Sequence, residues 1–450
     1  MNTALIILAA GKGTRMNSDL PKVLHPVAQA PLLEHAMAAG ATLQPTATIV
    51  VAGHGADQVR AAARSFDAEA VVVEQAEQLG TAHAVAQASA ALDGFDGVGI
   101  VLYGDTPFVQ PETLERMVAA LGDHDVVVLG FEAADPARYG RLILNGSTLE
   151  RIVEYKDASE EERLITLCNS GVIACKADLL FDLVDAVGNH NAGGEYYLTD
   201  IIGIARERGL LATAVTCDEA ETLGVNSRAD LAAADATFQA RARATLLEDG
   251  VTLMAPDTVY LARDTVIGRD AVIEPNVVFG PGVTVESGAL IRAFSHLEGC
   301  HVSRGAVVGP YARLRPGAEL AEDTRVGNFV EIKNARIDEG AKVNHLSYIG
   351  DATVGARANI GAGTITCNYD GVFKHHTEIG AGAFIGSNTM LVAPVTIGAG
   401  ALTGSGSVIT SDVEPHALAV ARAPQVEKAG VARKMFEMLK AKKARTQRSS

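Results

Sequence analysis

Residues 7–16, which read ILAAGKGTRM, join an apolar run to a glycine-rich turn that carries basic residues. Gly11 and Gly13 lack a Cβ atom and tolerate positive φ, so backbone N–H groups there can approach an anion closely. These residue types predict a phosphate-binding loop. Its spacing matches neither common motif, because a P-loop needs Lys-Ser/Thr after the second glycine and the dinucleotide fingerprint needs glycine where Met16 stands. We therefore expect a phosphate chemistry of a different class.

Up to about residue 226, apolar runs such as ALIILAA, ATIVVAG, AVVVEQ and VGIVLYGD alternate with helix-like stretches. Such alternation predicts a parallel sheet covered by helices on both faces, with ligands at the carboxyl ends of the strands. Both the GKGTRM turn and Asp105, which ends the run VGIVLYGD, fall at such ends. Residues 228–248 place Leu231, Phe238, Ala242 and Leu246 on one helical stripe, which indicates a connecting helix.

From Leu261 onward the spacing of aliphatic residues changes to six. The first series is Leu261, Ile267, Ile273, Phe279, Val285, Ile291 and Leu297, and the second is Val302, Val308, Leu314, Leu320, Val326 and Ile332. Shorter series follow at Ile337, Val343 and Ile349, at Val354 and Ile360, and at Ile379, Ile385, Leu391 and Ile397. This period predicts a parallel β-helix in which each six-residue side turns one aliphatic side chain inward.

The six-residue series is interrupted between Ile360 and Ile379 by the stretch TCNYDGVFKHH. A solenoid accommodates insertions as loops that leave the coil, and such loops commonly form binding faces. The segment 422–450 carries nine Lys and Arg residues against Glu427 and Glu437. Two interpretations of it stay open, a solvated tail or a segment that grips a phosphorylated ligand.

The overall composition narrows the class of protein. At 450 residues the chain is long enough for two domains, and its 48% hydrophobic and 20% charged content excludes disorder. A net charge of −16 argues against nucleic acid or an anionic membrane as a partner. The five cysteines are scattered without a C-x-x-C motif, which indicates reduced thiols rather than disulfides or zinc. No run is long enough to span a bilayer and no signal peptide is evident, so we expect a cytoplasmic protein.

An ordered set of motifs then points to a family. They are LAAGKGTRM, PKVLHPV, QAEQLGTAHAV, YGDTP, YGRL, IVEYKDA, NSG, EYYLTDI and GVNSR, followed by RPGAEL, VEIKNA, VNHLSYIGD, NIGAGTITCNYDG and IGSNT. Across nearly its whole length the chain resembles the bifunctional N-acetylglucosamine-1-phosphate uridyltransferase / glucosamine-1-phosphate N-acetyltransferase family. The resemblance implies a Rossmann-like uridyltransferase domain (1–226), a linker helix (227–250) and a left-handed β-helix acetyltransferase domain (251–450). It also implies a homotrimer with acetyltransferase sites between subunits.

For the uridyltransferase the resemblance implies UTP and N-acetylglucosamine-1-phosphate as substrates. The nucleotide would contact Leu8, Ala9, Ala10, Gly11, Gln75, Gly80 and Thr81, with Arg15 and Lys22 facing the triphosphate. The sugar phosphate would contact Gly140, Glu154 and Asn169, with Tyr103 and Gly104 lining the site. Asp105 and Asn226 offer hard oxygen ligands that suit Mg²⁺ together with phosphate oxygens and water, and the family places them on the metal. Asp105 could instead cap the segment that begins at Thr106.

For the acetyltransferase the resemblance implies glucosamine-1-phosphate and acetyl-CoA as substrates. An amine must lose a proton before it attacks a thioester, and the imidazole of His345 can accept one near neutral pH. The family places the catalytic base at this histidine, although a lone histidine on a solenoid is ordinarily a corner or surface residue. The sugar phosphate would contact Arg315, Lys333, Tyr348, Asn359 and Lys374. Acetyl-CoA would lie along Ala362, Asn368, Tyr369, Ser387, Ser405 and Arg422.

Two other functions remain as alternatives. One is a sugar-nucleotide pyrophosphorylase with a single activity, in which the β-helix serves only assembly or regulation. The His345 neighbourhood and the Asn368-Tyr369 insertion speak against it. The other is a trimerising scaffold with a degenerate nucleotide-binding module, which would be expected to have lost Lys22, Asp105 or Asn226, and all three are present.

Overall fold

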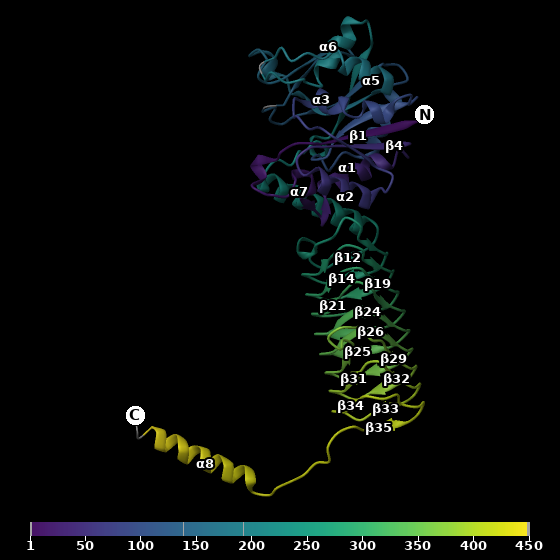
Figure 1. The fold of residues 1–450 in the computed structure, drawn as a ribbon, viewed down its shortest axis with the longest axis vertical. Coiled ribbons are helices and arrows are strands. Elements are labelled where there is room, and N and C mark those ends of the chain that lie inside the picture. The colour runs from purple at the N-terminus through teal and green to yellow at the C-terminus, as the bar shows by residue number, and fades with distance from the viewer. Residues whose placement is uncertain (1, 138, 192, 448–450) are drawn as a thin grey trace. The chain divides into compact units, whose positions relative to one another are not determined.

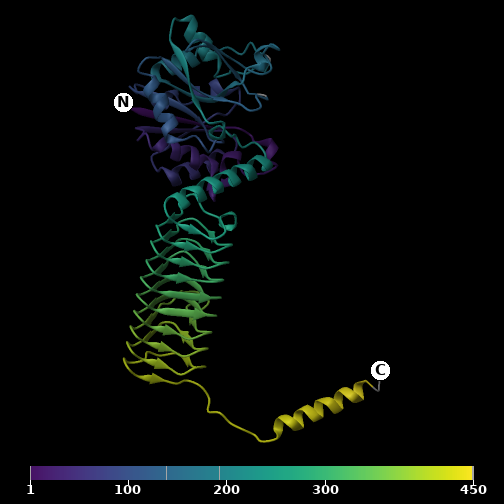
Figure 2. The same ribbon diagram turned by 180° about the vertical axis from the view of Figure 1, so that it is seen from behind.

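The computed structural model describes residues 2–137, 139–191 and 193–447, which divide into two units (Figures 1 and 2). The first unit runs through Thr245 and also includes Tyr260–Arg263. The second unit comprises Leu246–Val259 and the chain from Asp264 onward. The last three residues of the basic segment 422–450 lie outside the described residues.

A sheet with strand order β11-β7-β10-β6-β1-β4-β5 forms the centre of the first unit. Its strands are β1 (Thr3–Ala9), β4 (Ala47–Ala52), β5 (Val71–Glu74), β6 (Val98–Tyr103), β7 (Val126–Glu132), β10 (Leu167–Lys176) and β11 (Ala212–Cys217), and the hairpin β8 (Arg141–Asn145) and β9 (Thr148–Val153) extends it from β10. The expected parallel sheet is wrong for β10, which pairs antiparallel with both β6 and β7, and for the β8–β9 hairpin. The sequence between β7 and β10 holds the β8–β9 hairpin instead of a crossover helix, so the chain returns in the opposite direction.

Helices cover both faces of this sheet, as the alternation predicted. They are α1 (Leu32–Ala41), α2 (Ala56–Phe66), α3 (Thr81–Ala86), α4 (Pro111–Ala120), α5 (Ala177–Val184) and α6 (Asp200–Glu207). Successive side chains of β1 enter two separate cores: Ile6 packs with residues of α3, α5 and α6, whereas Leu5 and Ile7 pack with residues of α1, α2 and α4. The central strands are therefore apolar on both faces.

Helix α7 (Arg228–Glu248) occupies the segment for which a connecting helix was predicted. Its residues Leu231, Ala234 and Phe238 pack in a small cluster with Met16 of the glycine-rich turn. The buried Gln239 side chain exchanges two hydrogen bonds with the backbone of Leu261, at 2.8 and 2.9 Å. The first turns of the helix thus form part of the first unit.

The second unit is the β-helix that the six-residue period predicted. Its ten-stranded sheet comprises β12 (Thr252–Leu253), β14 (Val272–Ile273), β17 (Leu290–Ile291), β20 (Val307–Val308), β23 (Arg325–Asn328), β25 (Lys342–His345), β27 (Asn359–Ile360), β30 (Phe384–Ile385), β33 (Leu402–Thr403) and β35 (Leu418–Ala419). Its fourteen-stranded sheet comprises β13 (Val266–Ile267), β15 (Val278–Phe279), β16 (Thr284–Val285), β18 (His296–Leu297), β19 (Cys300–Val302), β21 (Arg313–Leu314), β22 (Ala318–Leu320), β24 (Glu331–Ile337), β26 (Tyr348–Val354), β28 (Ile365–Cys367), β29 (Thr377–Ile379), β31 (Met390–Val392), β32 (Val395–Ile397) and β34 (Val408–Ile409).

Every strand pair in the β-helix is parallel and in register, so each inward aliphatic side chain lies on its equivalent in the next coil. Ile291, Val308, Val326, Val343 and Ile360 form one such column and are all buried. We call the turn that follows this column the first corner. Equivalent residues of successive coils therefore stack along it.

The predicted insertion leaves the coil between β28 and β29. Tyr369 and Lys374 form an isolated antiparallel bridge inside it, and the coil resumes at Thr377. Beyond the last coil, helix α8 (Val431–Thr446) has no buried residue. In the described part of the chain no helix is both long and apolar enough to cross a membrane.

The inward aliphatic side chains predict the effect of a core truncation in the β-helix. Ile337 is fully buried in β24, and Ile337→Ala should lower the free energy of unfolding of the β-helix by about 2–5 kcal/mol because a cavity replaces the lost methyl groups. Ile337→Val should cost only about 0.5–1.5 kcal/mol. Urea unfolding followed by circular dichroism measures both values. Equal stabilities for the two variants would contradict the packing described here.

Candidate active sites

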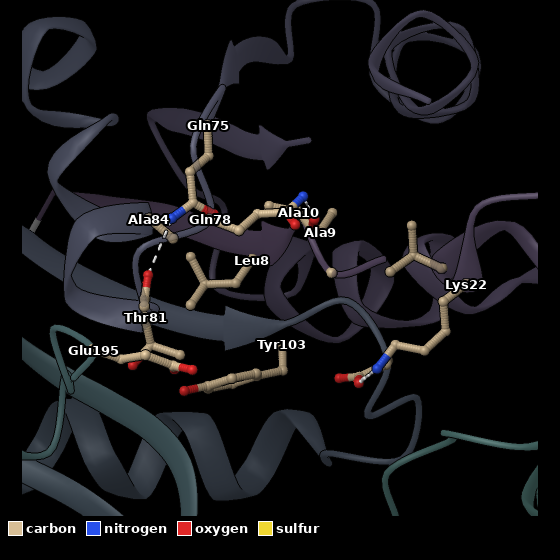
Figure 3. A pocket seen from close by; sticks show the side chains of 14 residues that line it. Leu8, Ala9, Ala10, Lys22, Gln75, Gln78, Thr81, Ala84, Tyr103 and Glu195 are labelled. Atoms are coloured by element: carbon tan, nitrogen blue, oxygen red, sulfur yellow. Dashed lines mark hydrogen bonds and ion pairs between the residues drawn. The ribbon is translucent and has the colours of Figure 1, made fainter. Parts of the chain in front are cut away.

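The first candidate site opens at the carboxyl edge of the sheet in the first unit. β1 and β6 are neighbours in parallel register, with Leu8 opposite Tyr103, so the loops that follow these two strands lie together. A pocket of about 350 Å³ lies there (Figure 3). Ten of the residues expected at the uridyltransferase site line it: Leu8, Ala9, Ala10, Gly11, Lys22, Gln75, Gly80, Thr81, Tyr103 and Asp105.

The glycine-rich turn allows a basic side chain to approach the end of β1. Gly13 has φ 57°, and a Cβ atom placed on it would lie 2.6 Å from Cβ of Lys22. Residues Thr14–Met16 then form one turn of 3-10 helix. A side chain at position 13 would therefore push Lys22 away from the pocket.

Amide side chains line the end of the pocket away from Lys22 (Figure 3). The buried Gln75 donates from Nε2 to the carbonyl oxygen of Gly80 at 3.0 Å. Gln78 donates from Nε2 to the carbonyl oxygen of Ala10 at 2.9 Å, which ties the loop after β5 to the loop after β1. Gln78 and Glu195 also line the pocket but were not predicted, although the position of Gln78 in the loop after a predicted strand was a usable signal.

The cations and the predicted metal ligands converge at the other end of this pocket. The ammonium group of Lys22 forms an ion pair with Oδ2 of Asp105 and donates to Oδ1 of Asn226 at 3.2 Å. The guanidinium group of Arg15 donates to the same Asn226 oxygen at 2.9 Å. The backbone N–H of Val225 donates to the carbonyl oxygen of Asp105 at 2.9 Å, which holds the two predicted ligands together.

The donor set of Asp105 and Asn226 fits a hard divalent cation only in part. Their two oxygens lie within reach of one ammonium group, so a small cation could contact both. Among residues 2–137, 139–191 and 193–447, no group of three His, Cys, Asp or Glu side chains could hold a metal ion. Mg²⁺ at this place would therefore need oxygen ligands from a phosphorylated substrate and water.

Gly140, Glu154 and Asn169 form a second cluster of predicted residues beside this pocket. The backbone N–H of Asn169 donates to the carbonyl oxygen of Gly140 at 2.8 Å, and a Cβ atom on Gly140 would lie 3.4 Å from Oε1 of Glu154. A Cβ atom on Gly171 would lie 2.6 Å from the ring of Tyr103. The pocket and the cluster are thus adjacent through Tyr103. Gly104 follows directly and donates its N–H to the carbonyl oxygen of Leu8 at 3.0 Å.

Burial controls the ionisation of this cluster. It is the main cause that raises the pKa of Glu154, and the neighbouring carboxylates of Asp200 and Asp157 add to the effect. Thr199 opposes it by donating a hydrogen bond to Oε1 of Glu154 at 3.2 Å. Burial likewise raises the pKa of the Tyr103 phenol, which keeps its hydroxyl protonated as a donor.

A buried arginine that was not singled out from the sequence supports this cluster. Arg141 is 1% exposed, and its guanidinium group donates to the carbonyl oxygens of four residues: Pro136, Ala137, Tyr139 and Arg163. These carbonyl groups belong to the two loops that precede Gly140 and follow Glu154. The YGRL motif contains this arginine, but its type alone does not distinguish a buried anchor from a ligand.

The second candidate site lies at the first corner of the β-helix. His345 ends β25 and is exposed, while Val343 on the same strand is fully buried. Nδ1 of His345 lies 2.8 Å from Oδ1 of Asn328, its equivalent in the preceding coil. With this carbonyl oxygen as acceptor, the proton is on Nδ1, and the lone pair of Nε2 is free to accept another.

The residues expected at acetyl-CoA continue the column that contains Asn328 and His345. Ala362, Ser387 and Ser405 each stand two positions after an inward residue of the ten-stranded sheet, as His345 does. Arg422 donates to the carbonyl oxygen of Ser405 at 2.6 Å. Together these residues mark a track along the first corner from His345 toward the last coil.

The other predicted acetyltransferase residues lie elsewhere on the β-helix. Arg315 forms an ion pair with Glu331 at 2.8 Å, and Tyr348 is the register partner of Glu331 in the fourteen-stranded sheet. Tyr348 also accepts a hydrogen bond from Nδ2 of Asn368 at 3.4 Å. Lys333 is in the same sheet, Asn359 is in the ten-stranded sheet, and Lys374 lies over the ring of Tyr369 in the insertion, 4.5 Å from its centre. Glu331 and Asp351, which contacts Asn368, were not predicted.

One chain thus does not bring all of these groups into one cavity. The cavity beside His345 is lined by neither Arg315, Lys333 nor Tyr348. A complete site of the expected composition would need groups from more than one face of the β-helix.

Both units match known families. Residues 5–170 match the MobA-like NTP transferase domain, and residues 264–299 and 376–411 match the bacterial transferase hexapeptide model of six repeats. The chain is 70% identical over its full length to the whole of the "Bifunctional protein GlmU" of Roseobacter denitrificans and 74% identical over 450 residues to the protein of the same name of Ruegeria pomeroyi. A crystal structure of UDP-glucose pyrophosphorylase with UDP-glucose is 17% identical, covering 54% of this chain and all of that chain, with a TM-score of 0.45.

The raised pKa of Glu154 predicts a pH dependence of stability. A carboxyl group whose pKa is higher in the folded state stabilises the fold below its unfolded pKa, and this stabilisation is lost as pH rises through the folded pKa. Glu154→Gln removes the buried charge. The free energy of unfolding of the variant, measured in urea, should therefore rise relative to that of the wild type as pH increases from 4 to 7. The exposed Glu160→Gln is the control and should show no such trend. A difference in the free energy of unfolding between Glu154→Gln and wild type that stays constant across this pH range would refute the raised pKa of Glu154.

Proposed function

The chain belongs to the family of bifunctional GlmU proteins, and from this premise we propose that it catalyses two successive steps of UDP-N-acetylglucosamine synthesis. The second unit acetylates glucosamine-1-phosphate with acetyl-CoA. The first unit then transfers UMP from UTP to N-acetylglucosamine-1-phosphate and releases pyrophosphate. One observation carries the proposal: each unit has its own site, with cations and oxygen ligands at the first and an oriented imidazole at the second.

In the uridyl transfer an oxygen of the sugar phosphate attacks the α-phosphorus of UTP, and the bond to the pyrophosphate oxygen breaks. The protein need not supply a nucleophile, because positioning and charge stabilisation suffice for this class of reaction. The amide and backbone groups around Gln75 and Gly80 bind the uracil and ribose. Arg15 and Lys22 contact the phosphate groups and stabilise the charge that builds on the departing pyrophosphate.

We assign Asp105 and Asn226 as the ligands that would hold Mg²⁺ together with oxygens of the nucleotide. When bound, Mg²⁺ would neutralise phosphate charge. Lys22 and Arg15, which now contact these two oxygens, are long enough to turn to the phosphate groups instead. Gly140, Glu154 and Asn169 would orient the sugar on the other side of Tyr103.

In the acetyl transfer the amine of the sugar attacks the thioester carbon, the C–S bond breaks, and coenzyme A leaves. Nε2 of His345 accepts the proton that the amine gives up, while Asn328 holds the ring by its other nitrogen. The coenzyme lies along Ala362, Ser387 and Ser405, with Arg422 at the far end and Asn368 and Tyr369 contributing from the insertion. Arg315, Lys333, Tyr348, Asn359 and Lys374 complete the acceptor site.

We further propose a homotrimer in the cytoplasm. The distribution of the acetyltransferase residues over different faces supports the oligomer, because a neighbouring copy could place Arg315 and Lys333 near His345. The five cysteines, none of which forms a disulfide, support a reducing compartment. Sedimentation that found a stable monomer with acetyltransferase activity would rule out the trimer.

Removal of the Asp105 carboxylate tests the first site. Asp105→Ala should abolish Mg²⁺-dependent pyrophosphate release from UTP and N-acetylglucosamine-1-phosphate, because an oxygen ligand and the partner of Lys22 are both lost. CoA release from acetyl-CoA and glucosamine-1-phosphate should be largely unchanged. Asp123→Ala, an exposed aspartate of the same unit, is the matched control. Near-normal turnover of Asp105→Ala at saturating Mg²⁺ would remove Asp105 from the metal site.

Removal of the imidazole tests the second site. His345→Ala should lower kcat for CoA release by roughly 10²–10⁴-fold, the usual contribution of a positioned general base. Pyrophosphate release should survive, and the exposed His301→Ala should leave both activities intact. If CoA release stays within about threefold of wild type while the oligomer is intact, His345 has a structural role only.

A further inference from the structure

Asn226, one of the two assigned oxygen ligands of the first site, stands directly before the start of helix α7. Its side chain faces the cations of the pocket, because Lys22 and Arg15 donate to its Oδ1 at 3.2 and 2.9 Å. Its backbone N–H has a different partner and donates to Oδ2 of Asp230 at 3.0 Å. Asp230 does not line the pocket, so it contacts the ligand residue from outside the site.

Asp230 belongs to a reciprocal pair of hydrogen bonds that caps the first turn of α7. Its Oδ2 also accepts the backbone N–H of Ser227 at 2.9 Å, and its own N–H donates to Oγ of Ser227 at 3.2 Å. Such a pair gives partners to N–H groups that have none within the helix. The carboxylate oxygen of Asp230 reaches one residue further, to Asn226, so this cap includes the ligand residue.

The first turns of α7 are themselves anchored on the segments that follow β1. Nε of Arg228 donates to the carbonyl oxygen of Met16, in the glycine-rich turn, at 3.2 Å. Oδ1 of Asp235 accepts the backbone N–H of Ala28 at 2.8 Å. A residue that Asp230 holds is therefore held relative to the edge of the sheet where the pocket lies.

The backbone around Asn226 is thus held on two sides. The N–H of Val225 donates to the carbonyl oxygen of Asp105 at 2.9 Å, and the N–H of Asn226 donates to Asp230. With two protein ligands assigned, each oxygen must already lie near its place before a substrate supplies the others. Groups that orient a ligand in this way commonly change metal affinity by about 10–100-fold when they are removed.

We propose that Asp230 is a positioning residue for the uridyl transfer, which holds Asn226 so that its Oδ1 and the carboxylate of Asp105 face one small cation. This inference rests on the proposed uridyltransferase function and on the two ligands assigned there. The role depends on a hydrogen-bond acceptor and not on negative charge, because the bond goes to a backbone N–H. Asparagine, whose side-chain oxygen also accepts, should therefore replace Asp230.

Three full-length variants test this role. Asp230→Ala should raise the Mg²⁺ concentration for half-maximal pyrophosphate release about tenfold, with kcat at saturating Mg²⁺ changed by less than about threefold, because excess cation overcomes lost positioning. Asp230→Asn should stay within about threefold of wild type in both values. Ser227→Ala is the matched control and should do the same, because it removes the other half of the cap and leaves the bond from Asn226 to Asp230. CoA release should equal that of wild type in every variant.

Two measurements do not depend on turnover. Hydrogen–deuterium exchange of the metal-free protein, followed by mass spectrometry, should show the N–H of Asn226 exchanging at least about tenfold faster in Asp230→Ala and near the wild-type rate in Ser227→Ala, because only the first variant removes its acceptor. Calorimetric titration of UTP should show about tenfold weaker binding to Asp230→Ala with Mg²⁺ present, and unchanged binding with EDTA.

The outcomes separate the possible roles of Asp230. Equal losses in Asp230→Ala and Ser227→Ala would overturn the inference, because capping of α7 alone would then explain them. A loss in Asp230→Asn as large as that in Asp230→Ala would also overturn it, since charge would then be responsible. An unchanged Mg²⁺ requirement of Asp230→Ala beside an active wild type would overturn the inference alone. A wild type without pyrophosphate release would instead overturn the proposed function, and hydrogen exchange would still decide whether Asp230 holds Asn226.

Discussion

Burial of aliphatic side chains at a fixed period is the constraint on which both halves of this chain depend. In the first unit the central strands carry buried aliphatic side chains on both faces, so they must be covered on both faces, and the charged groups of the site follow the strand ends. In the β-helix one aliphatic side chain turns inward per side, and the next coil must repeat it in register. The positions of polar groups follow from this packing, at the carboxyl edge in one unit and at the corners in the other.

Each packing mode produces a different kind of site. A sheet edge brings together loops that are far apart in sequence, and Lys22, Asp105 and Asn226 meet in this way although more than 200 residues separate the first from the last. A stack of coils brings together equivalent residues of neighbouring coils. Asn328, His345, Ala362 and Ser387 therefore form a line, which suits an extended ligand better than a compact one.

Basic side chains gather at two places in this acidic protein, and their hydrogen-bond and ion-pair partners differ between the two. At the sheet edge, Lys22 and Arg15 contact the oxygens of Asp105 and Asn226, which hold the two cationic side chains in place. Beside His345, Arg292 and Arg325 have no ion-pair partner among the residues that the structure describes, and they line a cavity together with Gly309 and Gly327. The first arrangement holds its cations on a carboxylate oxygen and an amide oxygen, and the second leaves them open to solvent.

The sequence by itself determined the two periodicities, the helix at 228–248 and the insertion after Ile360, because these depend on local spacing and residue type. It could not reveal that β10 runs antiparallel, since strand direction depends on what connects the strands and not on their composition. Arg141 and Asn328 were also out of reach. Their roles come from neighbours distant in sequence: a carbonyl oxygen of another loop or an imidazole one coil away. Tertiary structure decided these contacts because polar side chains, unlike buried aliphatic ones, show no sequence periodicity from which their partners could be predicted.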